Sequence, residues 1–110
     1  MDNSGRAAPL RVSSVLLAIH AAVVLILVAT FVVMLRGPQV DANIGAGLMM
    51  LLLLPLGVPW SFAFFLPGVS GHQADLIIAA AAIVNLVLHA LVVYLVRSHR
   101  ESVSRTSMHL

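Results

Sequence analysis

The chain has 110 residues, enough for one domain, and 61 % of them are hydrophobic while only 9 % are charged. Ordinary soluble domains are about 45–50 % apolar and about 25 % charged. A domain of this size leaves much of its surface facing outward, so it cannot hide such an apolar excess from water. The composition therefore favours a protein embedded in lipid.

Two further counts exclude classes of function. The chain has no cysteine, which excludes disulfides, thiolate catalysis and cysteine-based metal or iron–sulfur sites. The formal net charge is only +2, and the arginines stand beside apolar runs, so the membrane explains them better than nucleic acid does. We expect the lipid bilayer as a partner and no nucleic acid.

The N-terminal part predicts a polar tail followed by a membrane span. Residues 1–11 are mostly small or polar and are expected to be loosely ordered. The apolar run 12–35 holds no Asp, Glu, Lys or Arg and is bounded by Arg11 and Arg36. As a helix it would be about 36 Å long, enough to cross a bilayer. A cleaved signal peptide is the alternative, but its apolar region would be shorter, so we favour a retained helix.

A polar turn separates this run from the next. Gly37 and Pro38 predict a helix stop, because proline cannot continue the hydrogen-bond ladder and glycine suits the left-handed cap. Asp41 or Asn43 could cap the following helix, which we place over residues 44–66.

This second run contains helix breakers. Pro55 and Pro59 are four residues apart, so both fall on one helix face and would concentrate a bend around Gly57. The run is about 34 Å long if helical, which favours one kinked helix with Pro55, Gly57 and Pro59 as a candidate hinge. The alternative is a helix that ends near Pro59, with WSFAFFL along the interface and Trp60 as an anchor.

The third run is the clearest. Ser70 and Gln73 have the spacing of a capping box, which predicts a helix that begins at Gly71. The span itself is placed at about 75–96. Residues 97–110 form an Arg- and Ser-rich polar segment that we expect to be a frayed tail.

Together these elements predict an all-α integral membrane domain over residues 12–96, with three transmembrane helices in an antiparallel bundle and a proline-kinked middle helix. Three spans place the two termini on opposite sides. The C-terminal side then carries four arginines and the N-terminal side two: Arg36, Arg97, Arg100 and Arg105 against Arg6 and Arg11. The positive-inside rule favours a cytoplasmic C-terminus and an outside N-terminus in a multi-pass protein of the cell membrane.

Four polar residues within the spans are candidate intramembrane contacts: His20, Ser61, Asn85 and His89. Asn85 and His89 share a helix face. In this topology they form a sparse ladder with His20 and Ser61 that holds the helices together. Imidazoles could also carry protons, although no carboxylate lies in a span core to complete a relay. Haem ligation by His20 and His89 fails on depth, because the two differ by about 10 Å along the membrane normal.

No catalytic, cofactor-binding or metal site is expected, and the chain is not predicted to be an enzyme. The layout, with LPLGVPWSFAFFLPG as its most motif-like part, resembles small, uncharacterised three-span inner-membrane proteins of high-GC bacteria. That resemblance implies no activity. We predict a small accessory or self-associating membrane subunit, whose partners are a second copy or other membrane proteins. The alternative is a component of a small transporter or channel with His20, Asn85 and His89 as a polar path.

Overall fold

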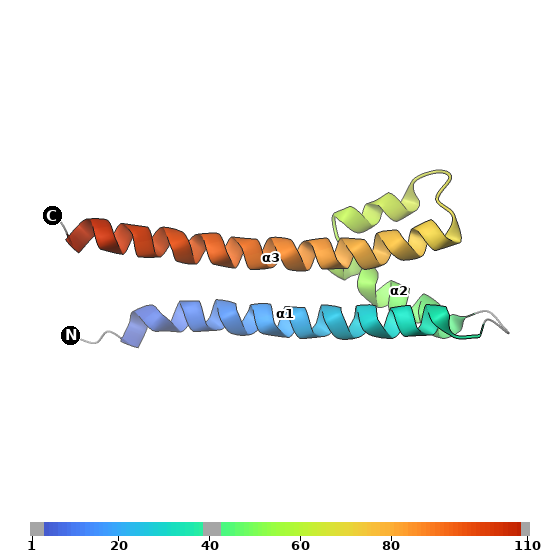
Figure 1. The fold of residues 1–110 in the computed structure, drawn as a ribbon, viewed down its shortest axis with the longest axis horizontal. Helices are drawn as coiled ribbons and strands as arrows, with labels where there is room; N and C mark the ends of the chain where they lie inside the picture. The colour runs from blue at the N-terminus through green and yellow to red at the C-terminus, as the bar shows by residue number, and fades with distance from the viewer. Residues whose placement is uncertain (1–3, 39–42, 109–110) are drawn as a thin grey trace.

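The computed structural model describes residues 4–38 and 43–108, and all regular structure in these ranges is helical, which confirms the predicted all-α class. The elements in chain order are α1 (Ser4–Arg36), α2 (Ile44–Leu56), the short 3₁₀ helix η1 (Trp60–Phe65) and α3 (Gly71–Met108). The long helices α1 and α3 lie side by side in opposite directions, with α2 and η1 at the end where α1 stops and α3 starts (Figure 1).

Two helices are long and apolar enough to cross a membrane: α1 over Arg11–Arg36, and α3. Few residues of either apolar stretch are buried, so most of their side chains face outward, unlike those of a core helix in a soluble protein. The third predicted span is not present as such. With 13 residues α2 is about 20 Å long, which is short of the roughly 30 Å of a bilayer core.

The proline stretch ends the middle helix instead of bending it. Pro55 lies in the last turn of α2, Gly57 is the C-cap, and the chain turns through the cis Val58–Pro59 peptide into η1. Neither proline has an N–H to donate, so the helical ladder loses two bonds within one short stretch. The chain therefore does not form the single kinked helix predicted over 44–66, and the alternative that ends near Pro59 is closer.

We call Ile44–Phe65 the α2–η1 hairpin. In Figure 1 its first arm runs inward between the long helices, and its second arm returns toward the end from which the first began. α2 packs against both α1 and α3, whereas η1 packs against α3. Because the chain returns before α3 begins, α1 and α3 are antiparallel, and the start of α1 lies at the same end as the end of α3 (Figure 1). The expectation that three crossings separate the termini does not fit this arrangement.

Both predicted tails contain more helix than expected. α1 begins at Ser4, inside the segment 1–11, and α3 continues to Met108 through most of the segment 97–110. Four hydroxyls of the latter segment donate to carbonyls of the preceding turn. Adding a residue to an existing helix costs far less than nucleating one, so a polar extension remains helical when it continues a long apolar helix.

Local capping signals predict the start of α2. The Oδ1 of Asn43 accepts a hydrogen bond from the Ala46 N–H at 3.0 Å, as expected of an N-cap. The Nδ2 of Asn43 also donates to the Met34 carbonyl at 2.7 Å, which ties the start of α2 to the last turns of α1. Asp41, the other candidate cap, lies outside the described residues.

The start of α3 also follows its predicted signal. The helix begins at Gly71, and the Ser70 N–H donates to Oε1 of Gln73 at 2.8 Å, which is one half of a capping box. Just before it, Gly68 has a φ of +86°, a conformation that favours glycine. This glycine lets the chain turn from η1 into α3.

Small side chains allow the hairpin to pack closely on α3. Gly57 and Ser61 are buried, and a Cβ added at Gly57 would lie 2.8 Å from the Cβ of Ala81 and 3.3 Å from the N of Ala82. Buried apolar side chains from all three α-helices form one cluster: Val24, Phe31, Ala46, Leu53, Ile78 and Ala82. The core therefore sits at the hairpin end of the molecule.

Replacing Gly57 by Ala should loosen this contact, because the neighbours of the new methyl group are a helix backbone and a short side chain. We expect Gly57→Ala to destabilise the fold by about 1–3 kcal/mol. Reversible unfolding of the purified protein in mixed detergent measures the change. Gly47→Ala is the matched control, because nothing lies within 4 Å of its added Cβ. Equal stability of the two variants would contradict the close packing of the hairpin.

Candidate functional site

Asn85, near the middle of α3, bonds to the tip of the hairpin. Its Nδ2 donates to the carbonyl of Leu56 at 2.8 Å and also to the carbonyl of Val58. These carbonyls belong to the last residue of α2 and to the turn after it, where a helix leaves its acceptors without internal partners. An uncovered carbonyl is costly in an apolar environment. The Asn85 amide therefore supplies a partner to two carbonyls that the end of α2 leaves without helical donors.

His20 and His89 form a direct contact between α1 and α3. Their Nδ1 atoms are 2.7 Å apart, and the ring centroids lie 5.0 Å apart at an interplanar angle of 35°. Both side chains are half-buried. When both imidazoles are neutral, one Nδ1 carries the hydrogen and the other accepts it, so the two rings hold opposite tautomers. The pair is a hydrogen-bonded bridge between the two long helices.

The predicted difference in depth between these histidines is wrong. It assumes parallel first and third spans, whereas α1 and α3 are antiparallel. Counted from the hairpin end, His20 is 16 residues before Arg36 and His89 is 18 residues after Gly71, or about 24 and 27 Å along the helices. The separation of 2.7 Å suits a hydrogen bond, because two nitrogens each about 2 Å from one metal ion would lie further apart. No group of three or more metal-ligating side chains occurs in the described part of the chain.

Ser61 lies apart from these contacts. Its side chain is fully buried, and within the described residues its hydroxyl has no hydrogen-bond partner. Its backbone N–H donates to the Gly57 carbonyl at 2.9 Å. The four predicted polar residues thus do not form one ladder. The structure joins His20 to His89 and Asn85 to the hairpin backbone, and it leaves Ser61 within the small-residue contact.

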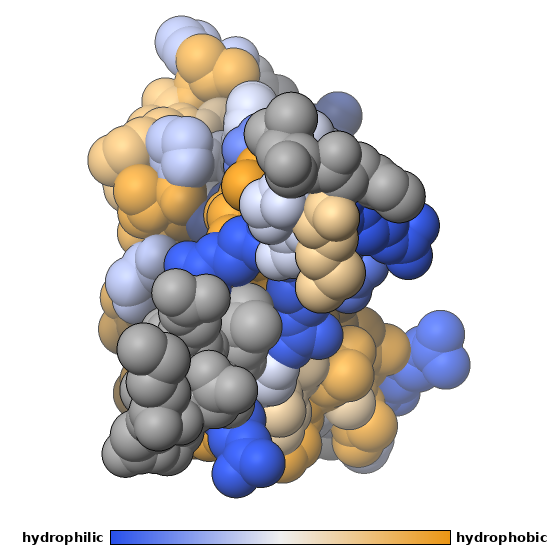
Figure 2. All heavy atoms as spheres, turned by 90° about the vertical axis from the view of Figure 1, so that its left-hand side faces the viewer, coloured by the Kyte–Doolittle hydropathy of each residue, from blue (hydrophilic) through white to orange (hydrophobic). Residues whose placement is uncertain are grey.

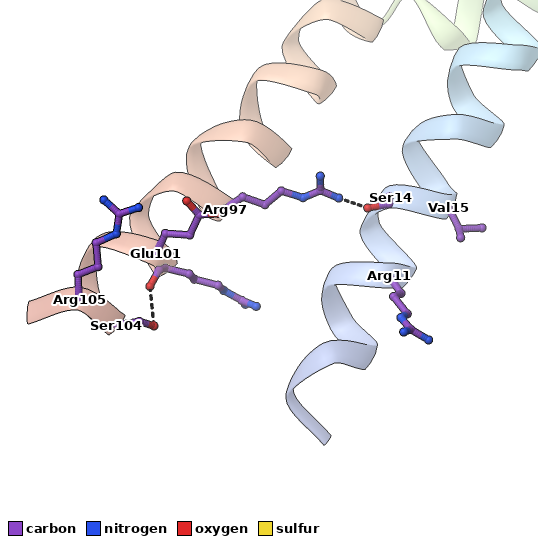
Figure 3. Close-up of a pocket in the computed structure, with 8 residues that line it drawn as sticks. Arg11, Ser14, Val15, Arg97, Glu101, Ser104 and Arg105 are labelled. Carbon is purple, nitrogen blue, oxygen red and sulfur yellow. Dashed lines mark hydrogen bonds between the residues drawn. The ribbon is translucent and has the colours of Figure 1, made fainter. Parts of the chain in front are cut away.

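A basic pocket lies at the other end of the molecule, and sequence reasoning missed it. Four arginines from both long helices line it, together with Ser14 and Ser104: Arg11, Arg97, Arg100 and Arg105 (Figure 3). Its volume is about 820 Å³. Seen end-on, hydrophilic atoms lie between apolar flanks there (Figure 2). The predicted three-span topology places Arg11 and Arg97 on opposite sides of the membrane, so it could not bring them together in one pocket. A topology with an even number of crossings would have placed both arginines on the same side.

One contact closes this pocket across the helix pair. The Arg97 guanidinium reaches from α3 and donates to the Ser14 hydroxyl on α1 (Figure 3). Within the described residues, Arg11, Arg100 and Arg105 make no ion pair, although Glu101 lies on the same wall. The lining therefore has an excess of positive charge that no other described residue neutralises.

No family model, curated protein or solved structure matches this chain. Three structural features of the chain therefore bear on its role. These are the Asn85 contact to the hairpin, the His20–His89 bridge and the basic pocket.

Removing the Asn85 amide should release the hairpin tip. In Asn85→Leu two carbonyls lose their donor, and we expect a destabilisation of about 1–2 kcal/mol. Mixed-detergent unfolding measures it, and labelling of a cysteine at Val58 by a permeant maleimide reports the hairpin locally. Val87→Ala is the control, because Val87 lies on an exposed face of the same helix. If Asn85→Leu matches this control in both assays, the Asn85 contact does not hold the hairpin.

Proposed function

We propose that this chain is a multi-pass protein of the cell membrane in which α1 and α3 cross the bilayer, and that it acts as a small accessory or self-associating subunit without a catalytic site. One observation carries the proposal. The polar groups His20, Asn85 and His89 are bonded to other parts of the chain, whereas apolar side chains such as Ile26 and Val33 are 65 % and 70 % exposed. Lipid or another apolar surface suits such an exterior.

The distribution of arginine supports a cytoplasmic location for both ends of the helix pair. Five of the six arginines lie toward the end where α1 begins and α3 ends, and Arg36 alone lies toward the hairpin end. Five against one is a wider margin than the four against two of a three-span topology. The proposal keeps the C-terminus in the cytoplasm and moves the N-terminus to the same side.

In this orientation the α2–η1 hairpin enters the bilayer from the outer side and returns to that side. Asn85 is 14 residues after the start of α3, so the tip of the hairpin lies about 21 Å along that helix. Irregular backbone at membrane depth is tolerated where protein covers it. Asn85 provides part of that cover, which supports a re-entrant hairpin over a third crossing.

The outer face of α1 supports self-association. Ala18, Ala22 and Ala29 are exposed on one face of the helix, and this face is apolar. Small residues at such spacing let two helix backbones approach closely in lipid, where packing replaces the hydrophobic driving force. Ala18 and Ala22 lie within four residues of His20, but both are exposed whereas His20 is half-buried.

A transporter or channel component remains the second candidate, and the His20–His89 pair favours it. Two imidazoles with their Nδ1 atoms 2.7 Å apart can pass one proton between them. With only two crossing helices, a polar path would have to form between copies. Proton flux in proteoliposomes that is lost in His20→Leu and His89→Leu would favour transport; unaltered assembly with no flux would favour the accessory subunit.

Topology gives the most direct test of the membrane arrangement. The chain has no cysteine, so single cysteines can be placed at Ser4, Ser70 and Ser107 in an otherwise unchanged background. In intact cells an impermeant maleimide should label only the Ser70 variant, and inside-out vesicles should reverse the pattern. Labelling of the Ser4 and Ser107 variants from opposite sides would contradict the two-crossing arrangement. Release of the protein by alkaline carbonate would contradict membrane insertion.

Self-association can be tested on the alanine face of α1. We expect Ala22→Ile to weaken dimer formation about fivefold or more, because the larger side chain separates the two backbones. Energy transfer between labelled copies in dilute proteoliposomes measures this. Ala90→Ile is the matched control, because Ala90 is also exposed but lies on α3. No energy transfer between wild-type copies, together with no cross-linked membrane partner, would contradict the subunit role.

A further inference from the structure

We propose that the basic pocket between the outer ends of α1 and α3 binds the phosphate group of an anionic phospholipid. The proposal rests on the proposed membrane insertion, because a lipid reaches this pocket only if the two helices cross the bilayer. The site is separate from the polar contacts within the helix pair. It lies at the opposite end of the long helices from the hairpin (Figures 1 and 3).

The donor set of the pocket suits a phosphate. Four guanidinium groups face one carboxylate, that of Glu101, and two serine hydroxyls complete the lining. Guanidinium forms charge-assisted, bidentate bonds to phosphate oxygens. The guanidinium groups of Arg11 and Arg100 make no hydrogen bond or ion pair within the described part of the chain, so their donors can serve a ligand. Glu101 is four residues from both Arg97 and Arg105, whose charges offset its own.

The position of the pocket selects a lipid as the source of that phosphate. Arg11 is the last charged residue before the apolar stretch of α1, and Arg97 is the first after the apolar stretch of α3. Both therefore stand at the boundary between hydrocarbon and head groups. Val15, on the hairpin side of Arg11, adds an apolar wall below the charged groups, where an acyl chain would begin.

Residues from both long helices line the pocket, so its arginines are gathered at one site and are not spread over the surface. The Arg97 guanidinium donates to the Ser14 hydroxyl, which joins the two helix ends at the pocket (Figure 3). A volume of about 820 Å³ is in the range of ligand pockets and accommodates a phosphoglycerol head group. Basic pockets between transmembrane helices on the cytoplasmic side are known to take such head groups.

Native mass spectrometry of the full chain released from nanodiscs tests this site. The nanodiscs contain equal parts of phosphatidylglycerol and phosphatidylcholine, and the measurement is the ratio of the two lipids that remain bound. We expect a preference for phosphatidylglycerol that falls about fivefold in Arg11→Gln and about fivefold in Arg100→Gln. Arg36→Gln, the same change at the hairpin end, should leave the ratio unchanged. Both pocket arginines are exposed and make no contact that the fold needs.

Each outcome separates the site from its alternatives. An equal loss in Arg36→Gln would show general attraction to anionic lipid and would overturn the proposal. Displacement of phosphatidylglycerol by millimolar inorganic phosphate would assign the pocket to free phosphate. Carbonate extraction of the same variants reports insertion alone. An inserted wild-type protein with no preference for phosphatidylglycerol, or inserted Arg11→Gln and Arg100→Gln variants that keep the full preference, would contradict the pocket, whereas failure of the wild-type protein to insert would contradict the proposed function.

Discussion

The contact between the Asn85 amide and the carbonyls of Leu56 and Val58 is the interaction on which the rest of the structure depends. Pro55 and Pro59 deprive the middle segment of donors, so a helix cannot continue through it without leaving acceptors bare. The helix ends instead, and the Asn85 amide covers the carbonyls of Leu56 and Val58, which this end leaves without helical donors. Once Asn85 has bonded to the turn, the chain reverses about 21 Å along α3 rather than crossing to the far side.

This one reversal decides which distant residues meet. Because the hairpin returns to its own side, α3 runs antiparallel to α1 instead of parallel to it (Figure 1). His20 then meets His89, and Arg97 reaches Ser14. With a third crossing, both pairs would lie at different depths or on different sides. The stretch from Pro55 to Pro59 thus sets both the long-range contacts between α1 and α3 and the composition of the basic pocket.

The sequence was sufficient for features that depend on neighbouring residues. The apolar runs predicted helices, Asn43 and the Ser70–Gln73 pair predicted where two of them begin, and polarity within the runs identified His20, Asn85 and His89 as residues in need of partners. The sequence was insufficient where the same residues are compatible with two structures. A proline pair both bends and ends helices, and the difference in free energy lies in packing: Gly57 and Ser61 fit against Ala81 only in the hairpin. The partners of the polar residues and the arginine pocket depend on that outcome.

The positions of the polar side chains follow the free-energy cost of burying them. In the described residues, the side chains that bond between elements within the apolar stretches are two imidazoles and one amide, and none is a carboxylate, an ammonium or a guanidinium. The guanidinium groups stand at the ends of those stretches, where water and head groups lower the penalty for a charge. The inner groups bond to one another or to the hairpin backbone, so these contacts hold the fold. None of the four pocket arginines has an ion-pair partner within the described residues, so their guanidinium groups are the polar groups best placed to bind an anion from outside.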